Sequence, residues 1–296
     1  MYLLYFDEKY KERADALAER MKISAAPGVT DKSAGSTVPG VTDKSADSTV
    51  PADNEKTSEA EGSGEAFEGT PGYDINELHL ELSDEGLALK QGKLSMCGDF
   101  SELVPRIRKG KLDSEMQVKA ARLKNYTKSG LPVLLDATAG MGEDSFILAA
   151  AGFRVILYEY DVLIASLLED ALLRAKDNPE TAAVVSRMEL RIGDSIAAMN
   201  DMDGEADVIL LDPMFPARTK SAMVKKKFQL LQQLEQPCAD EAELMTAAIN
   251  ANPDKIVIKR PVKGPWLAGM KPDYSMEGKA IRYDCIINVA SRKKDK

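Results

Sequence analysis

Acidic residues and glycines occur together in one short stretch, Asp136-Ala-Thr-Ala-Gly-Met-Gly-Glu-Asp144. An apolar run at 132–135 precedes it and a helical pattern follows it. That order predicts a strand, a tight turn and a helix, in which Gly140 and Gly142 let the backbone turn sharply and let a ligand approach it. A second apolar run ends in Glu159, whose carboxylate could accept hydrogen bonds from a ribose diol. The pattern therefore predicts a nucleotide-type ligand and leaves its identity open.

Charges beside the glycines bear on which ligand fits. A dinucleotide fingerprint would have glycine or alanine where Ser145 stands, and Glu143 and Asp144 open the expected helix. Carboxylates at the positive end of a helix repel a second anion such as a pyrophosphate. A ligand with a sulfonium and an ammonium, S-adenosylmethionine (SAM), suits these charges better than NAD does. On this stretch alone, a Rossmann-like dehydrogenase and a purely structural turn remain alternatives.

The turn Asp212-Pro-Met-Phe-Pro216 follows another apolar run. Asp212 can accept hydrogen bonds from an amino group on a planar base, the Pro213 carbonyl is expected to point the same way, and Phe215 offers a stacking face. An exocyclic nitrogen is a poor nucleophile because its lone pair is delocalised into the ring, so it must be aligned for transfer. The turn therefore predicts transfer of a methyl group to such a nitrogen, against the plainer reading of an Asp-Pro turn that leaves a strand.

Strand and helix patterns alternate from Pro132 onward. The predicted strands lie near 132–136, 154–159, 187–192, 206–212, 255–260 and 281–289. Alternation of this kind predicts an α/β fold with a doubly wound, mainly parallel sheet of Rossmann-like type, and a ligand site at the carboxyl ends of its strands. Asp194 and Ser195 follow the third strand, where the carboxylate could accept from an adenine amino group, although Gly-Asp-Ser is also an ordinary helix N-cap.

Composition divides the chain into four segments. They are an N-terminal strand and helix (1–23), a disordered insert (24–72), a small α+β cap (73–130) and a SAM-binding methyltransferase domain (131–296). The insert contains a dodecamer that occurs twice in succession, with Asp47 in place of Gly35 as the only difference. Such a segment has too few apolar residues to bury a core, which predicts disorder.

The cap is predicted to contain a hairpin, one more strand and a helix. The hairpin spans 78–90 and carries His79 on its solvent-facing side, the further strand lies near 96–103, and the helix covers 113–128.

The net charge of −9 is unevenly distributed along the chain. Nine acids and three lysines in 24–72 contribute −6, which leaves about −3 for the remainder. Basic residues cluster near the Asp212 turn and at the end of the fifth predicted strand, where phosphate contacts with RNA are expected. They are Arg218, Lys220, Lys225, Lys226, Lys259 and Arg260.

The apolar runs are too short to span a bilayer, and the basic start of a signal peptide is missing. The three cysteines lie far apart without the spacing of metal ligands. We therefore expect a cytoplasmic protein with neither a membrane partner nor a bound metal.

The Asp136–Asp144 and Asp212–Pro216 motifs, together with Lys220–Lys226 and Val257–Pro261, resemble the RsmJ-type 16S ribosomal RNA guanine-N2 methyltransferases over about 73–290. The resemblance implies a SAM-dependent enzyme that methylates N2 of a specific guanine in small-subunit ribosomal RNA, either as RNA or within the 30S subunit. It implies donor contacts at Glu143, Asp144, Glu159, Tyr160, Asp194, Ser195 and Asp212. Three alternatives stay open: an amino methyltransferase acting on DNA adenine, one acting on protein glutamine, and a non-catalytic RNA-binding protein.

Overall fold

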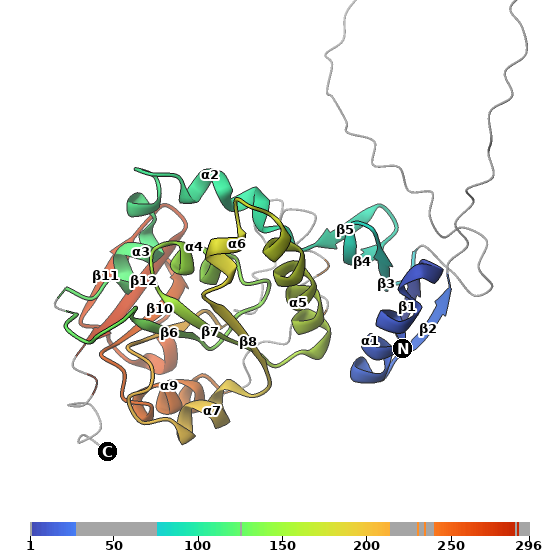
Figure 1. Cartoon of the computed structure of the whole chain (residues 1–296). Coiled ribbons are helices and arrows are strands. Elements are labelled where there is room, and N and C mark those ends of the chain that lie inside the picture. The colour runs from blue at the N-terminus through green and yellow to red at the C-terminus, as the bar shows by residue number, and fades with distance from the viewer. Residues whose placement is uncertain are drawn as a thin grey trace, which may run out of the picture.

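A seven-stranded sheet forms the centre of the larger part of the molecule (Figure 1). The computed structural model describes residues 2–27, 76–124, 126–213, 230, 234, 240–287 and 289. The strands are β6 (Val133–Asp136), β7 (Arg154–Glu159), β8 (Met188–Ile192), β9 (Val208–Leu211), β10 (Lys255–Pro261), β11 (Tyr274–Glu277) and β12 (Ile281–Ile287), in the order β11-β12-β10-β9-β6-β7-β8. From β10 to β8 all pairings are parallel, whereas β12 and β11 add antiparallel pairs. The predicted doubly wound, mainly parallel α/β fold is confirmed.

Helices cover both faces of this sheet (Figure 1). One face carries α3 (Met116–Ala121), α4 (Glu143–Ala150), α5 (Val162–Asp177) and α6 (Ala182–Val185), and the other carries α7 (Ser195–Asp201) and α9 (Glu241–Asn250). Side chains of the central strand β9 alternate between the two cores, so Val208 and Leu210 face one and Ile209 and Leu211 the other. The strand is buried along its whole length because both faces are covered.

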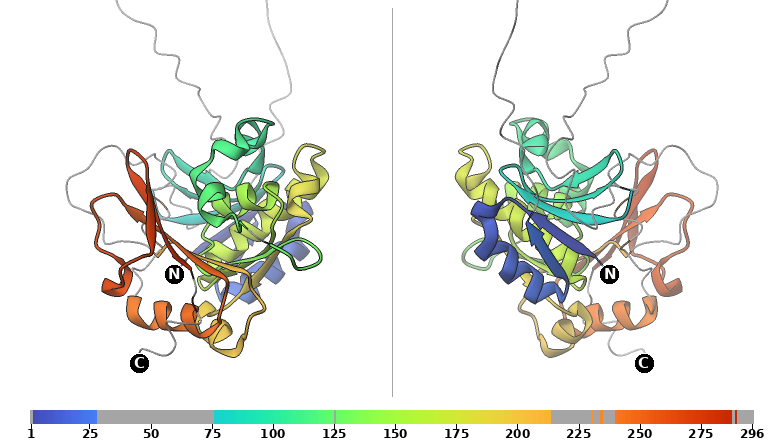
Figure 2. Two further views of the ribbon diagram at one scale, coloured as in Figure 1. Left: turned by 90° about the vertical axis from the view of Figure 1, so that its left-hand side faces the viewer. Right: turned by 90° about the vertical axis from the view of Figure 1, so that its right-hand side faces the viewer.

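A second sheet joins segments that lie far apart in the sequence. Its strands are β1 (Leu3–Phe6), β2 (Ser24–Pro27), β3 (His79–Ser83), β4 (Gly86–Gln91) and β5 (Leu94–Cys97), in the order β2-β1-β3-β4-β5. Figure 2 shows the blue and cyan strands side by side, with α1 (Lys11–Met21) next to them. The strand β2 extends four residues into the segment predicted to be a disordered insert, and 28–75 lie outside the described residues.

The N-terminal sheet packs against α5 through both apolar and charged contacts. Leu163 and Leu167 of α5 share a core with leucines of β3 and β4. Beside this core, Asp170 is 1% exposed and pairs with Arg13 of α1 and with Arg174 of α5. Breaking a buried ion pair leaves one charge unpaired, so this contact fixes how the sheet sits on α5.

Three predicted features of the cap are wrong. His79 is buried rather than solvent-facing: its ring lies edge-on to Tyr5 and contacts a carboxylate oxygen of Glu81. The strand expected over 96–103 ends at Cys97, after which Asp99 caps a 3-10 turn at Phe100–Leu103. The alternation of apolar and polar residues in β3 does not show that the polar face, which carries His79, is covered as well.

The helix expected over 113–128 is also shorter than predicted, because α3 ends at Ala121. The ammonium of Lys255, on β10, donates to the carbonyls of Ala120 and Arg122 and so satisfies the groups left over at the end of the helix. The sequence around residue 121 does not show that the helix ends there, because the capping residue Lys255 lies far away along the chain. In the described part of the chain, no helix combines the length and apolarity needed to cross a membrane.

We predict that Gly86→Ala destabilises the fold more than Gly152→Ala does. Both glycines have positive φ, 107° and 100°, so alanine strains the backbone at either position by about 1–3 kcal/mol. A Cβ at Gly152 meets open space, whereas one at Gly86 would collide with Arg174 Nε and Asp170 Oδ2. Denaturant unfolding should show an additional loss of at least about 1 kcal/mol for Gly86→Ala. Equal losses would show that the contact of the sheet with α5 tolerates displacement.

Candidate active site

The turn after β6 has the positive-φ backbone that its glycines predicted, and the missing side chain of Gly142 serves packing within the protein. Gly140 and Gly142 have φ values of 53° and 72°. A Cβ on Gly142 would lie 2.8 Å from Leu168 Cδ1 of α5 and 3.5 Å from Phe100 Cζ. Gly142 therefore lets α4 begin close against α5, whereas Gly140, two residues earlier, donates its N–H to Glu159 at the tip of β7.

Asp136, at the end of β6, organises this turn from inside. Its carboxylate is buried, accepting from Ser145 Oγ at 2.6 Å and from the Thr138 N–H at 3.1 Å. Burial raises the pKa of Asp136 to about 7, with the nearby charges of Asp144 and Asp212 adding to the effect. Because only 3% of Asp136 is exposed, its carboxylate is placed to hold the glycine turn in shape.

Glu159 joins the tip of β7 to the glycine turn. One carboxylate oxygen accepts from the Gly140 N–H and the other from the Asp161 N–H, both at 2.9 Å. Burial raises the pKa of Glu159, and these backbone hydrogen bonds partly offset that rise. Each carboxylate oxygen can accept a second hydrogen bond, so the geometry leaves acceptor capacity for a sugar diol. The neighbouring ring of Tyr160 is 77% exposed at the same edge.

The central feature of the site is one ammonium shared by two carboxylates. Lys259 Nζ, on β10, lies 2.7 Å from Asp144 Oδ2 and 2.8 Å from Asp212 Oδ2. The Asp212 N–H donates to Thr138 Oγ1 at 2.7 Å, which fixes the start of the turn after β9, and Pro213 is buried behind it. The Asp212 side chain itself is 40% exposed, so its carboxylate is held in place yet reaches the surface.

Burial and charge act in opposite directions within this cluster. Burial raises the pKa of Asp212, the Lys259 ammonium lowers it, and the net direction is upward. For Lys259, burial alone would lower the pKa, but the carboxylates of Asp212 and Asp144 outweigh it and the pKa rises. Lys259 therefore stays charged, and its charge favours the ionised form of Asp212.

Sequence reasoning missed three residues of the site. Thr138 Oγ1 accepts from the Asp212 N–H. Gln117 Nε2 donates to Asp144 Oδ1 at 3.5 Å. Tyr283 lies opposite Lys259 in the antiparallel pair of β10 and β12 and is buried. Burial, followed by the charge of Asp144, raises the pKa of its hydroxyl. Thr138 could have been found within the Asp-Ala-Thr motif, but the register that brings Tyr283 here has no local signal.

The predicted RNA contacts fare differently. The proposed contact of Arg260 with RNA is wrong, because its guanidinium is fully buried and pairs with Glu241 at 3.1 Å. Lys259 is directed at the two carboxylates rather than at a phosphate surface. The other predicted contacts lie outside the described residues, as does the stacking residue Phe215; these are Arg218, Lys220, Lys225 and Lys226.

The third strand tip bears out the plainer interpretation of its motif. Asp194 caps α7 by accepting from the Ile196 N–H at 2.8 Å, and Ser195 is the first residue of that helix. The carboxylate is exposed at the same edge as Glu159, so it also remains available to a ligand.

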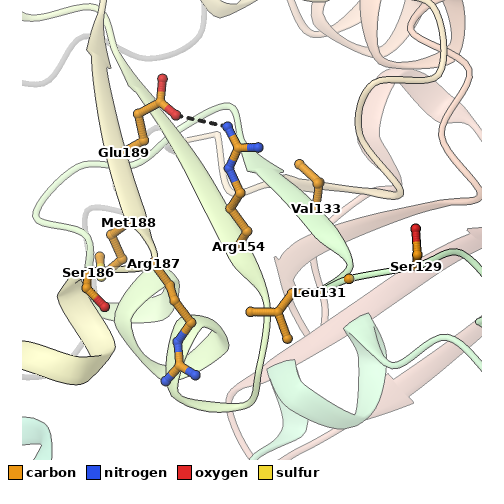
Figure 3. A pocket seen from close by; sticks show the side chains of 9 residues that line it. Ser129, Leu131, Val133, Arg154, Ser186, Arg187, Met188 and Glu189 are labelled. Atoms are coloured by element: carbon orange, nitrogen blue, oxygen red, sulfur yellow. Dashed lines mark hydrogen bonds and ion pairs between the residues drawn. The ribbon is translucent and has the colours of Figure 1, made fainter.

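A cavity of about 500 Å³ lies at the opposite end of the strands. It is lined by the starts of β6, β7 and β8, and Figure 3 shows its two guanidinium groups, those of Arg154 and Arg187, pointing apart. Arg154 is paired with Glu189 there. Ligands of open α/β sheets bind at the carboxyl ends of the strands, so the acid cluster and not this cavity is the candidate site.

The described residues at the carboxyl edge fit a cationic adenosyl ligand. Carboxylates stand at successive strand tips, Glu159 after β7, Asp194 after β8 and Asp212 after β9, beside a turn with positive-φ glycines. This row offers acceptors for hydroxyl and amino groups and a negative field for a sulfonium and an ammonium. Among the described residues, no group of three or more potential ligands converges on a metal site.

Comparisons with known proteins agree with this fit. Residues 72–288 match the family described as "Putative SAM-dependent methyltransferase". Two proteins named ribosomal RNA small subunit methyltransferase J are similar to the chain. The one from Pseudomonas aeruginosa (strain LESB58) is 49% identical over 71% of this chain and 82% of its own, and the one from Ectopseudomonas mendocina (strain ymp) is 40% identical over 73% and 85%.

A solved structure extends the likeness to the fold of nearly the whole chain. The SAM-dependent methyltransferase NGO1261 of Neisseria gonorrhoeae covers 99% of both chains with a TM-score of 0.62 at 22% identity. At this level of identity the likeness concerns the fold alone.

Fold and site together define a Rossmann-like methyltransferase of class I that uses SAM as its methyl donor. Within that class, the chain belongs to the ribosomal RNA small subunit methyltransferase J family. The resemblance indicated by the sequence motifs is thereby confirmed, and the dehydrogenase and non-enzymatic alternatives are set aside.

We predict that Glu159→Gln weakens donor binding about tenfold or more. An amide has one acceptor oxygen and no charge, so the ribose diol would lose a hydrogen bond to a charged group, which contributes about 1.5–3 kcal/mol. Titration calorimetry with SAM measures the effect. Glu189→Gln, on the exposed surface of β8, is the matched control and should bind SAM like the wild type. Unchanged affinity in Glu159→Gln would remove Glu159 from the donor site.

Proposed function

We propose that this chain transfers a methyl group from SAM to the N2 amino group of a specific guanine in 16S ribosomal RNA, presented as RNA or within the 30S subunit. The observation that carries the proposal is Asp212, a carboxylate held at the tip of β9 between the glycine turn and Lys259 and still 40% exposed. The names of relatives at 40–49% identity, ribosomal RNA small subunit methyltransferase J, support small-subunit ribosomal RNA as the substrate. Such a substrate places the reaction in the cytoplasm.

Asp212 would orient the acceptor. Its carboxylate accepts a hydrogen bond from the N2 amino group, and the carbonyl of Pro213 accepts the second, which draws the nitrogen lone pair out of the plane of the ring. Thr138 fixes the backbone of Asp212, and Lys259 fixes the carboxylate and keeps it ionised. The target guanine would be flipped out of its helix, because an enzyme cannot reach a stacked base, and it would then stack on Phe215.

The carboxylates at the strand ends would bind the donor. Glu159 would accept from the ribose hydroxyls and Asp194 from the adenine amino group, with Tyr160 and Ser195 beside them. Glu143 and Asp144 follow the glycine turn as the first two residues of α4. Their negative charges would favour the positive charges of the donor. SAM supplies a methyl group on a cationic sulfur. As N2 forms its bond to the methyl carbon, the carbon–sulfur electron pair remains on sulfur, and N2 loses one proton to water.

RNA backbone contacts would come from the basic residues that follow the acceptor turn. Arg218, Lys220, Lys225 and Lys226 carry four positive charges within nine positions, directly after the turn that holds the target base. Neutralising phosphates in this way makes binding salt-dependent without reading sequence. Arg260 takes no part, because it is committed to Glu241.

We predict that the purified protein labels 16S ribosomal RNA taken from cells that lack it, at one guanine N2. Asp212→Ala should lower the rate about a hundredfold or more, because an aligned group is lost, while SAM affinity stays within a fewfold of wild type. Asp177→Ala, at the exposed end of α5, is the matched control. Radiolabel transfer followed by mapping of the modified base measures both. Label on DNA or protein instead, or turnover of Asp212→Ala within threefold of wild type, would contradict the proposal.

A further inference from the structure

An exposed tryptophan lies in the loop that follows β10, the strand that carries Lys259. Trp266 is the only tryptophan of the chain, and 43% of its surface is exposed. Its neighbour Leu267 is fully buried in the core beneath α9. The loop thus buries the side chain of Leu267 in the core and exposes that of Trp266 to solvent. The exposed part of the indole ring gains no stability from burial.

Two buried arginines hold this loop in shape. The guanidinium of Arg282 donates to the carbonyls of Pro261, Val262, Gly264 and Pro265 at 2.7–3.3 Å and pairs with Asp284. Arg260 donates to the Pro265 carbonyl at 3.2 Å, and its partner Glu241 accepts from the Ala268 N–H at 3.3 Å. Backbone groups on both sides of Trp266 are therefore anchored, the carbonyls before it by the buried arginines and the Ala268 N–H after it by Glu241, so the indole is displayed on a rigid support.

The loop leaves the sheet at the edge where the acceptor is held. β9 and β10 run parallel, with Leu211 opposite Ile258, so Asp212 and Lys259 leave the pair at the same level and bond to each other. The loop begins at the end of β10, two residues after Lys259. Within it, Lys263 is exposed and adds a positive charge three positions before Trp266.

We propose that the Trp266 loop, residues 261–268, is a stacking platform for an unpaired nucleobase that flanks the target guanine, with Lys263 at the adjoining phosphate. The inference rests on the proposed function, since it assigns a second contact to the same RNA. A rigid, exposed aromatic ring next to a lysine suits single-stranded nucleic acid, because every base has a face that can stack. A strand whose target base is held at Asp212 passes this edge of the sheet, which places a neighbouring nucleotide within the reach of the loop.

The single tryptophan makes a direct test possible. Intrinsic fluorescence of the wild-type protein should be quenched by 16S ribosomal RNA and by a short single-stranded segment that contains the target guanine. A fully paired duplex of the same segment should not quench it, because its bases are already stacked. SAM alone should leave the emission unchanged.

Variants separate stacking from folding. Trp266→Ala should weaken binding of the single-stranded segment about tenfold or more, whereas Trp266→Phe should retain most of the affinity. Lys263→Ala should lower the slope of log affinity against log salt by roughly one. Leu173→Ala, an exposed apolar residue on α5, is the matched control. SAM affinity should match wild type in all four.

Three results would overturn the inference. Unquenched emission at saturating RNA, together with normal methylation of ribosomal RNA by Trp266→Ala, would show that the loop does not touch the RNA while the proposed function stands. Quenching by an isolated 30S protein but not by RNA would assign the loop to a protein contact instead. Failure of the wild type both to bind and to methylate ribosomal RNA would remove the proposed function, and the platform with it.

Discussion

The ammonium of Lys259 holds together the two halves of the site. Asp144 comes from α4 on the donor side and Asp212 from the turn after β9 on the acceptor side, and both carboxylates lie within 2.8 Å of the same nitrogen. Without that cation they would repel each other, because two charges about 4 Å apart interact by about 4 kcal/mol at an effective dielectric constant of about 20. The strand register makes the arrangement possible, since Lys259 is the first residue of β10 beyond its pairing with β9.

Hydrogen bonds around the glycine turn and packing of the N-terminal sheet hold the elements near this bridge in place. Asp136 and Glu159 tie the glycine turn to the tips of β6 and β7, and Thr138 carries that order to Asp212. The sheet of the N-terminal segment is fixed to α5 by the buried charge of Asp170. Its core also includes Leu230 and Leu234, so residues downstream of the acceptor turn pack against it. A change in the N-terminal sheet is therefore connected to the acceptor side through packing.

Patterns repeated along the chain were predictable, and contacts between distant segments were not. Alternating apolar runs placed six of the seven strands of the central sheet and missed β11, and the strand-end acids marked the carboxyl edge as the site. Lys259 and Arg260 are adjacent and both basic, so the sequence pattern predicted an RNA contact for both. The structure separates them because successive strand residues point to opposite faces, one toward the acids and the other toward Glu241. Tyr283 depends on the pairing of β12 with β10, and His79 and the end of α3 depend on partners more than seventy positions away, for which composition has no signal.

The pH dependence of kcat/KM for Lys259→Met tests the central claim most directly. Asp212 is faced by Lys259 from β10, by Asp144 from α4 and by Asp136 from β6, with Arg260 and Tyr283 also nearby. Activity needs the ionised carboxylate, so the rate falls as the pH drops through the pKa of Asp212. Removing the cation should raise that pKa and move the acidic limb of the profile upward by about 1–3 pH units, with recovery at high pH. Lys259→Arg should keep the limb in place, as should the exposed control Lys176→Met. An equal loss at every pH in Lys259→Met, with the limb unmoved, would contradict the account.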